Sequence, residues 1–334
     1  MRAWEIQRFG VDGLELVDRK DPEPAPGGVV VRMRAASLNY RDLMMVSGVY
    51  NPKMRMPLVP LSDGVGEVVA VGSEVRSVKV GDRVAGTFFQ AWTGGRMTED
   101  GARSALGGAI DGVLAEYVAL SENGVVPVPE HLTDEEAATL PCAALTAWNA
   151  LVTQGRIKAG DTVLVLGTGG VSIFALQFAV MSGARVVVTS SSDEKLERAR
   201  GLGAFGTVNY RTAPEWHEGV RELTSGVGVD HIVEVGGAGT FGRSLKAVRR
   251  GGSISLIGVL AGAGEVNLMS VLMNGLRVQG IFVGSREMFV DMNRAIAAHG
   301  MRPVVDRVFG FEDARAAYAH MASAAHFGKI CIRF

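Results

Sequence analysis

A glycine-rich turn near the middle of the chain constrains its fold more than any other feature. The apolar run Val163–Leu166 leads directly into Gly167–Ser172, and an apolar helix candidate follows. In such a turn Gly167 permits a tight bend, Gly169 lets a pyrophosphate approach the backbone, and the helix N-terminus supplies free N–H donors and a positive dipole. Ser172 replaces the third glycine of the G-x-G-x-x-G pattern, and a small side chain still allows the helix to pack on the strand. The turn predicts a dinucleotide site after a parallel strand.

The pattern of predicted secondary structure changes once along the chain. The first part consists of short β-type runs separated by Gly, Pro, Ser or Asp, which is typical of a mostly β domain. After Pro127 and Pro129, strands alternate with helices, as a parallel sheet covered on both faces requires. Capping-box spacing predicts helix starts at Thr133, Ser191 and Thr212. The candidate strands of this second part are Thr162–Leu166, Arg185–Thr189, Thr207–Asn209, Asp230–Val235, Ser253–Ile257 and Arg277–Val283.

These patterns predict an α/β protein with two domains and a returning tail. The length of 334 residues corresponds to about two domains of typical size. We expect residues 1–127 to form the mostly β domain and residues 128–284 to form a doubly wound, six-stranded parallel sheet with its helices. Residues 285–334 are too few for a domain, so we expect them to pack back onto the first one.

Charge and cysteine content exclude several functional classes. Lys plus Arg total 34 and Asp plus Glu total 35, without a basic cluster, which disfavours a nucleic-acid partner. The N-terminus carries charges where an export signal needs an apolar run, and the most apolar helix candidate, Val171 to Met181, is too short for the ~20 residues that span a bilayer. Two cysteines fit a reducing compartment. We therefore expect a cytoplasmic protein with neither a membrane nor a nucleic-acid partner.

The end of the second parallel strand indicates which dinucleotide binds. NAD enzymes usually place Asp or Glu there to accept from the ribose 2′-hydroxyl, whereas this chain has Thr189 or Ser190. The small hydroxyls leave room for a 2′-phosphate, which Lys195, with Tyr210 or Arg211, could neutralise or hydrogen-bond. This pattern favours NADP(H) over NAD(H). In the alternative interpretation Lys195 is only a solvated surface charge.

Several ordered motifs resemble the medium-chain dehydrogenase/reductase family over essentially the whole chain. The resemblance implies a GroES-like β domain, a Rossmann domain, an active site in the cleft between them and often a homodimer joined through the last Rossmann strand. It also implies that residues 86–114 form a loop beside that cleft. The motifs are Ala35–Asp42, Asp63–Val68 followed by Val71–Gly72, Gly81–Val84 and Gly167–Ser172.

The zinc branch of this family binds its catalytic metal through Cys, His and Cys. By the resemblance, Asn39 and Ser62 occupy the first two of these positions, and only Cys142 falls at a former ligand position. All six histidines lie after residue 130, and the four closely spaced cysteines of the family's structural zinc are missing. One cysteine cannot hold a tetrahedral zinc. We therefore expect a zinc-free protein in which Cys142 is a buried small hydrophobe.

A zinc-free site needs other groups to stabilise oxygen charge when a hydride arrives. Ser37–Leu43 and Ser47–Pro52 resemble zinc-free quinone oxidoreductases and the enoyl reductases of fatty-acid and polyketide assembly. In these relatives residues placed like Asn39 and Asp42 lie near the nicotinamide, and a tyrosine placed like Tyr50 faces the substrate. We expect these three residues to be catalytic. Alternatively, the first two only cap a helix and the tyrosine is only a packing residue.

Further cofactor residues follow from strand ends and from the resemblance. Thr146 holds a position that contacts the nicotinamide in relatives, and residues after the fifth and sixth strands would line its pocket. Strand-end turns and hydrogen bonding within a helix are the structural alternatives. The complete expected cofactor set is Asn39, Thr146, Gly167, Gly169, Gly170, Val171, Ser190, Ser191, Lys195, Tyr210, Gly258, Val259, Val283 and Gly284.

The sequence thus predicts a zinc-independent, NADPH-dependent oxidoreductase that transfers hydride to an α,β-unsaturated carbonyl compound or a quinone. The alternative is a zinc-free alcohol dehydrogenase with a tyrosine as acid and base, since Gly167–Ser172 resembles dehydrogenase-like members more than the Ala-rich turn of quinone oxidoreductases. A third hypothesis is a nucleotide-binding structural or regulatory protein without catalysis. The expected partners are a small carbonyl substrate and a second copy of the chain.

Overall fold

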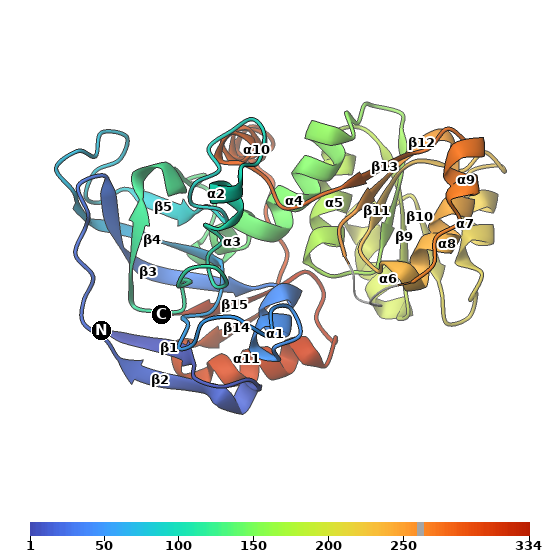
Figure 1. Ribbon diagram of the computed structural model, residues 1–334. Coiled ribbons are helices and arrows are strands. Elements are labelled where there is room, and N and C mark those ends of the chain that lie inside the picture. Colours follow the sequence, from blue (N-terminus) through green and yellow to red (C-terminus); the bar gives the residue numbers. More distant parts are fainter. Residues whose placement is uncertain (259–263) are drawn as a thin grey trace. The chain divides into compact units, whose positions relative to one another are not determined.

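A computed structural model describes residues 1–258 and 264–334 of the protein (Figure 1). The chain forms two compact units, of which the first combines Met1–Leu145 with Gly284–Phe334 and the second is Thr146–Val283. The division after Leu145 lies later than the expected boundary after residue 127. The reason is that α3 (Asp134–Ala138) packs against strands of the first unit rather than the second.

A seven-stranded sheet forms the frame of the first unit. Its order is β14-β15-β3-β4-β5-β7, and β6 pairs with β3. The pairs are antiparallel except for β14 and β15, which run parallel. A separate two-stranded sheet contains β1 (Arg2–Ile6) and β2 (Leu14–Asp18). The seven strands are β3 (Gly28–Leu38), β4 (Asp63–Val71), β5 (Arg83–Gly86), β6 (Tyr117–Ser121), β7 (Val125–Pro127), β14 (Val305–Gly310) and β15 (Lys329–Arg333).

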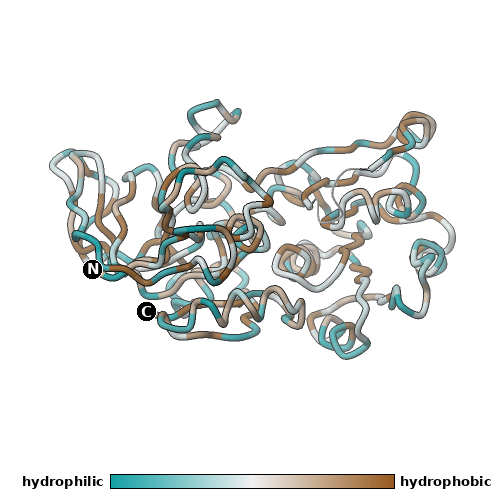
Figure 2. The backbone as a smooth tube through the Cα atoms, turned by 60° about the horizontal axis from the view of Figure 1, so that its bottom comes forward, coloured by the Kyte–Doolittle hydropathy of each residue, from teal (hydrophilic) through white to brown (hydrophobic). Residues whose placement is uncertain are grey.

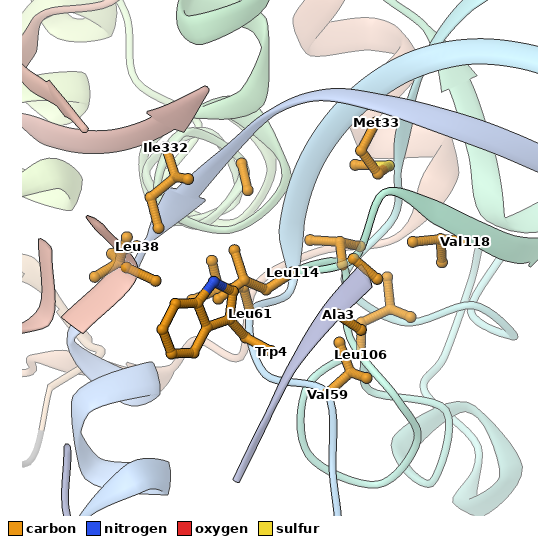
Figure 3. Close-up of a cluster of buried hydrophobic side chains, with 14 of the residues drawn as sticks. Ala3, Trp4, Met33, Leu38, Val59, Leu61, Leu106, Leu114, Val118 and Ile332 are labelled. Carbon is orange, nitrogen blue, oxygen red and sulfur yellow. The ribbon is translucent and has the colours of Figure 1, made fainter. Parts of the chain in front are cut away.

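The core of the first unit joins segments from both ends of the chain. Trp4, Leu38, Leu61 and Ile332 belong to one cluster of buried side chains, seen in Figure 3. The Trp4 indole N–H donates to the carbonyl of Phe311 at 2.8 Å, so the polar edge of this large ring is satisfied inside the core. The helices of the unit are α1 (Tyr40–Val46), α2 (Glu99–Ala102), α3, α10 (Arg286–His299) and α11 (Ala314–Ala322), with short turns η1 (Val11–Gly13), η2 (Glu122–Gly124), η3 (Leu140–Ala144) and η5 (Phe311–Asp313).

The second unit confirms the predicted Rossmann architecture. Its described strands form a parallel six-stranded sheet in the order β10-β9-β8-β11-β12-β13. Compared with the predicted ranges, β12 begins earlier and β13 ends earlier. The strands are β8 (Thr162–Leu166), β9 (Arg185–Ser190), β10 (Gly206–Asn209), β11 (Val229–Glu234), β12 (Val248–Leu256) and β13 (Arg277–Gly280).

The helices of the second unit follow the strands in alternation. Hydrophobic and hydrophilic stretches alternate along the chain in both units (Figure 2), as expected for elements that bury one face. Among the described residues, no helix has both the length and the apolar character needed to cross a membrane. The helices are α4 (Leu145–Trp148), which begins at the unit boundary, η4 (Asn149–Gln154), α5 (Gly170–Met181), α6 (Asp193–Gly201), α7 (Trp216–Leu223), α8 (Ala238–Ala247) and α9 (Leu268–Met273).

One of the three predicted capping boxes is confirmed. The Thr133 hydroxyl accepts from the backbone N–H of Glu136 at 3.2 Å and starts α3. The prediction for α6 was wrong by one residue, because Ser192 rather than Ser191 caps that helix. The prediction at Thr212 was also wrong: its hydroxyl donates to the Asn209 carbonyl in the turn after β10, and α7 begins only at Trp216.

Candidate active site

The start of α1 places Asn39 and Asp42 in the capping arrangement that the sequence left as an alternative. The backbone N–H of Asn39 donates to the Asp42 carboxylate at 2.7 Å, and the backbone N–H of Asp42 donates to the Asn39 carbonyl at 2.9 Å. Asp42 is completely buried. Its carboxylate therefore stabilises the helix start, where the Asn39 side chain also faces the Asp42 backbone N–H as in a capping box.

Burial also controls the charge of Asp42. Removal from water raises the pKa of its carboxyl from 3.8 to about 6, although the Arg41 guanidinium, 3.9 Å away, and the Asn39 N–H both act to lower it. The buried charge of Asp63 adds to the rise, and Lys329 opposes it. Asp42 consequently changes its protonation state near neutral pH.

The side chain of Asn39 lies in a buried polar cluster drawn from four segments of the first unit. Its Nδ2 donates to the Ser62 hydroxyl at 3.5 Å, and its Oδ1 accepts from the Lys329 ammonium at 2.6 Å. The Ser62 hydroxyl donates to Asp63 at 2.7 Å, and the backbone N–H of Cys142 donates to the same carboxylate at 3.2 Å. We name Asn39, Ser62, Asp63, Cys142 and Lys329 the amide cluster.

Local backbone geometry delivers Ser62 and Asp63 to this cluster. Leu61, directly before them, has a φ of +68°, a left-handed conformation that is uncommon for a residue with a large side chain. Its side chain is fully buried, and its carbonyl accepts from the Val113 N–H at 3.0 Å. Packing thus fixes the bend that starts β4 at Asp63.

The donor set of the amide cluster does not fit zinc. Two positions hold a neutral amide and a hydroxyl, and the third is a thiol whose pKa is raised well above its usual value by burial and by the neighbouring Asp63 charge, so it stays protonated. The Lys329 ammonium adds a positive charge among them. In the described part of the chain, no three His, Cys, Asp or Glu side chains converge as a metal site requires.

Tyr50 lies near the amide cluster in sequence and is linked to its surroundings by Arg41. The ring is 43% exposed, and the Arg41 guanidinium lies 5.7 Å from its centroid and 4.6 Å from that of Phe88. Arg41 also donates to the Leu106 carbonyl at 2.9 Å. The Tyr50 side chain is therefore accessible but supported from one side.

The glycine turn of the second unit has the open geometry expected of a phosphate site. Gly167 has a φ of +75°, which favours glycine, and Gly169 precedes the first turn of α5, which begins with Gly170 and Val171. A Cβ atom added to Gly167 or Gly169 would meet no protein atom within 4 Å, so the space beside the turn is free for a ligand. The Ser172 hydroxyl donates to the Leu166 carbonyl at 2.7 Å, which explains how serine replaces the third glycine.

The ends of β9 and β10 lie beside this turn at the same edge of the sheet. Leu166 pairs with Thr189, and Ser190 pairs with Asn209, whose successor Tyr210 is half-exposed. No carboxylate ends β9, because its last two residues are Thr189 and Ser190. Ser191 and Lys195 follow at the start of α6, where the Ser192 hydroxyl caps the helix. Asp193, which lies between them in the sequence, accepts from the Asn209 amide at 2.7 Å.

The structure accounts for each of the remaining expected cofactor residues in a different way. Gly258 needs no ligand to account for it, because a Cβ there would collide with the Val235 carbonyl. Val259 lies outside the described residues. Val283 has a φ of +53°, unusual for a β-branched residue, and its carbonyl accepts from the buried Asn149 amide at 2.8 Å. Two residues lie at unit boundaries: Thr146 is buried at the first, and a side chain on Gly284 would meet Leu145 at the second.

Sequence reasoning missed two charged members of this arrangement. Lys329 opens the apolar strand that closes the chain, and Asp63 begins β4; both are buried. A lysine at the start of an apolar strand was the available signal. A second missed group is Glu234 at the end of β11, whose buried carboxylate accepts from the N–H groups of Gly236 and Gly237 and from the hydroxyls of Thr240 and Ser244.

A β unit built on a seven-stranded sheet, together with a Rossmann unit that has an open glycine turn, is typical of nicotinamide-dependent dehydrogenases and reductases. Comparison with known proteins agrees. Residues 25–130 match the alcohol dehydrogenase GroES-like domain, and residues 170–298 match the zinc-binding dehydrogenase family. The chain belongs to the medium-chain dehydrogenase/reductase superfamily and is an NAD(P)H-dependent oxidoreductase.

Three similar proteins show the range of this relationship. A zinc-type alcohol dehydrogenase-like protein of Schizosaccharomyces pombe is 45% identical, with 97% of this chain and 96% of that protein covered. A crystal structure of an NAD-dependent alcohol dehydrogenase has a TM-score of 0.92 and 36% identity, with 100% of both chains covered. An acryloyl-coenzyme A reductase of Metallosphaera sedula is 29% identical, with 96% of each chain covered.

Replacing Asp42 by Asn should change how stability depends on pH. The folded protein holds a proton on Asp42 up to about pH 6, whereas the unfolded chain releases it near pH 3.8, so the wild type loses stability as the pH rises through this window. The variant does not titrate there. Its free energy of unfolding relative to wild type should therefore rise by up to about 3 kcal/mol between about pH 4 and about pH 7.

Urea unfolding at a series of pH values measures this difference. Asp12→Asn, at an exposed position of the same unit, is the control and should show a flat difference across the range. A flat difference for Asp42→Asn as well would contradict the raised pKa.

Proposed function

We propose that this protein is a zinc-independent, NADPH-dependent reductase of α,β-unsaturated carbonyl compounds or quinones. The observation that carries this proposal is the amide cluster, in which an amide, a hydroxyl and an ammonium group occupy the surroundings of Cys142 where a metal-binding relative would need donor atoms for zinc. With no metal to polarise a carbonyl, the reaction depends on hydrogen-bond donors.

The cofactor supplies the hydride, and residues of this chain hold it and manage the proton. The space beside Gly167 and Gly169 accepts the pyrophosphate, with the first N–H groups of α5 as donors. After hydride reaches the β-carbon of an enone, the enolate takes up one proton to give the saturated carbonyl compound. Tyr50 is the candidate donor of that proton because its side chain is exposed and a phenol can donate to an enolate.

The absence of a carboxylate at the end of β9 supports NADPH. An acid at this place would repel a 2′-phosphate, whereas Thr189 and Ser190 do not. Lys195 in the first turn of α6 and the half-exposed Tyr210 directly after β10 are our candidates for contacts with this phosphate. The NAD dependence of one similar structure keeps NADH as the competing cofactor.

A second candidate function is a zinc-free alcohol dehydrogenase. The resemblance to alcohol dehydrogenases, at 36% and 45% identity, favours it, whereas the similar acryloyl-coenzyme A reductase acts on a conjugated thioester by its name. The same Tyr50 hydroxyl would then exchange a proton with an alkoxide rather than an enolate. The two functions differ in whether the saturated ketone is a substrate or an inert product.

Initial rates of NADPH and NADH oxidation with an enone, a quinone and the matching saturated ketone separate these functions. We expect NADPH to reduce the enone or the quinone at a rate that a chelator does not change. Tyr50→Phe should lower kcat by roughly 10²-fold, because the proton donor is lost, and Tyr117→Phe should leave it unchanged. Activity confined to the saturated ketone would favour the alcohol dehydrogenase, and loss of activity with chelator would contradict zinc independence.

Ser190→Asp tests the cofactor assignment. A carboxylate at the end of β9 should repel the 2′-phosphate and accept from a ribose hydroxyl, so the ratio of kcat/KM for NADPH over NADH should fall by at least about tenfold. Ser190→Asn is the matched control because it adds similar volume without charge. Equal ratios in both variants would show that Ser190 does not face the 2′-position.

We also propose that two copies associate through the edge of the Rossmann sheet. In the described residues β13 pairs only with β12, so its other edge is open, and α9, which precedes β13 in the chain, exposes apolar side chains. Leu272 and Met273 are each 70% exposed, and Leu268 and Met269 are also exposed.

Light scattering tests this association. The wild type should have the mass of two chains, and Leu272→Glu combined with Met273→Glu should shift it toward one, because charge is then placed on the contact surface. Val80→Glu, at an exposed apolar position of the first unit, should leave the mass unchanged. A wild type with the mass of one chain would refute the proposal.

A further inference from the structure

Lys329 is a buried charge that the proposed reaction, as described so far, does not use. Its side chain is only 3% exposed, and its ammonium donates to the Leu38 carbonyl and to Asn39 Oδ1, each at 2.6 Å. The Asp63 carboxylate lies 3.8 Å from the ammonium. All of these groups belong to the first unit.

Stability alone does not explain this arrangement. Burying an ion pair costs desolvation free energy for both charges, and apolar replacements of similar volume are often equally or more stable. Burial raises the pKa of Asp63, and the Lys329 charge is the main influence that opposes the rise. Fold stability is therefore weak evidence for the purpose of this pair, which lies next to the side chain of Asn39.

The ammonium determines which end of the Asn39 amide faces the site. A lysine ammonium only donates hydrogen bonds, so the amide oxygen must point toward it and the amide nitrogen must point away. The nitrogen has two hydrogens, and its contact with the Ser62 hydroxyl is long at 3.5 Å. The Asn39 side chain also hydrogen-bonds the Asp63 carboxylate and so helps to lower the pKa of that group. Asn39 is 8% exposed, so a negatively charged substrate oxygen can replace the long contact with Ser62 by a stronger hydrogen bond from the same N–H.

We propose that Lys329 is a positioning residue that holds Asn39 as a hydrogen-bond donor to the substrate oxygen that becomes negatively charged during hydride transfer. The positive charge also polarises the amide through its oxygen and so strengthens the N–H that faces the substrate. Lys329 and Asn39 together do at this oxygen what a zinc ion does in metal-dependent relatives, with no metal ligand involved. The inference rests on the proposed carbonyl reduction.

The experiment compares three variants of the full chain: Asn39→Ala, the charge-balanced double variant Lys329→Met/Asp63→Asn, and the triple variant that combines them. The substrate is the enone or quinone that the wild type reduces best. Removing one oxyanion donor should lower kcat by roughly 10²-fold, and the loss of the Lys329 charge should lower it by about 10-fold or more. Because Lys329 acts through Asn39, the combined variant should lose no more than Asn39→Ala alone.

Two further variants test the direction of the amide. Asn39→Asp keeps the shape but has no N–H, so it should lose kcat as Asn39→Ala does. Lys329→Arg is still only a hydrogen-bond donor and should retain most of the activity. Lys329→Gln can present either an oxygen or a nitrogen to Asn39, so it should lose most of the activity. This comparison stands even where the charge-balanced pair fails to fold.

The control is Arg83→Met, which removes another cation of the first unit that binds Asp134 at 2.7 Å and the Leu132 carbonyl at 2.8 Å. It should change stability without changing kcat. NADPH affinity, measured by fluorescence, should stay within about threefold of wild type in Arg83→Met, since no cofactor contact is altered.

The outcomes separate the two levels of the argument. A wild type that reduces no enone, quinone or ketone refutes the proposed function. If the wild type is active, two results refute the positioning role alone. One is a loss of kcat in the combined variant that equals the product of the separate losses, and the other is full kcat after loss of the Lys329 charge. Equal activity of Lys329→Arg and Lys329→Gln would also refute it.

Discussion

The amide cluster depends on one buried ion pair, between Lys329 and Asp63, and the pair depends in turn on strand register. β15 pairs with β3 so that Ile330 lies opposite Leu38, and β3 pairs with β4 so that Ser37 lies opposite Asp63. These two ladders bring a residue near the C-terminus next to one near position 63. A shift of either register by one residue would turn these side chains to the opposite face of the sheet.

The features that sequence could predict are those set by local pattern. The run from Thr162 to Leu166, the turn after it and the helix beyond form a continuous segment whose period and glycines specify it without distant contacts. The parallel sheet is predictable for the same reason, because its central strands β8 and β9 are apolar and buried on both faces. Even the exception at Ser172 is local, since its hydroxyl is satisfied by the carbonyl of Leu166.

What the sequence could not predict depends on pairing between distant segments or on competition among neighbouring polar groups. In the sequence, Lys329 is indistinguishable from an ordinary solvated charge at the start of a strand. Its ammonium is buried because β15 lies between β14 and β3. The predicted helix cap at Thr212 is wrong because the Thr212 hydroxyl donates to the backbone carbonyl of Asn209 in the turn. For Asn39 and Asp42 the sequence left two roles open, and the structure combines them: the Asp42 carboxylate and the Asn39 side chain form the capping box, and the same Asn39 amide also binds Lys329 in the cluster.

The role of the Asn39 amide matters for how enzymes of one family can use different groups to stabilise a substrate oxygen on the same fold. The similar protein of Schizosaccharomyces pombe is described as zinc-type, yet the chemistry of such a site resides in three side chains and not in the sheet that carries them. In the zinc-independent site that we propose, an amide and a hydroxyl offer a metal weaker donors than thiolate or imidazole, and the buried ammonium would repel a dication. The Asp63 carboxylate lies 3.8 Å from the Lys329 ammonium and balances its charge. The positive charge stays in the same buried cluster, but it is covalently part of the chain, so that its effect on a substrate oxygen is limited to what the Asn39 amide can transmit.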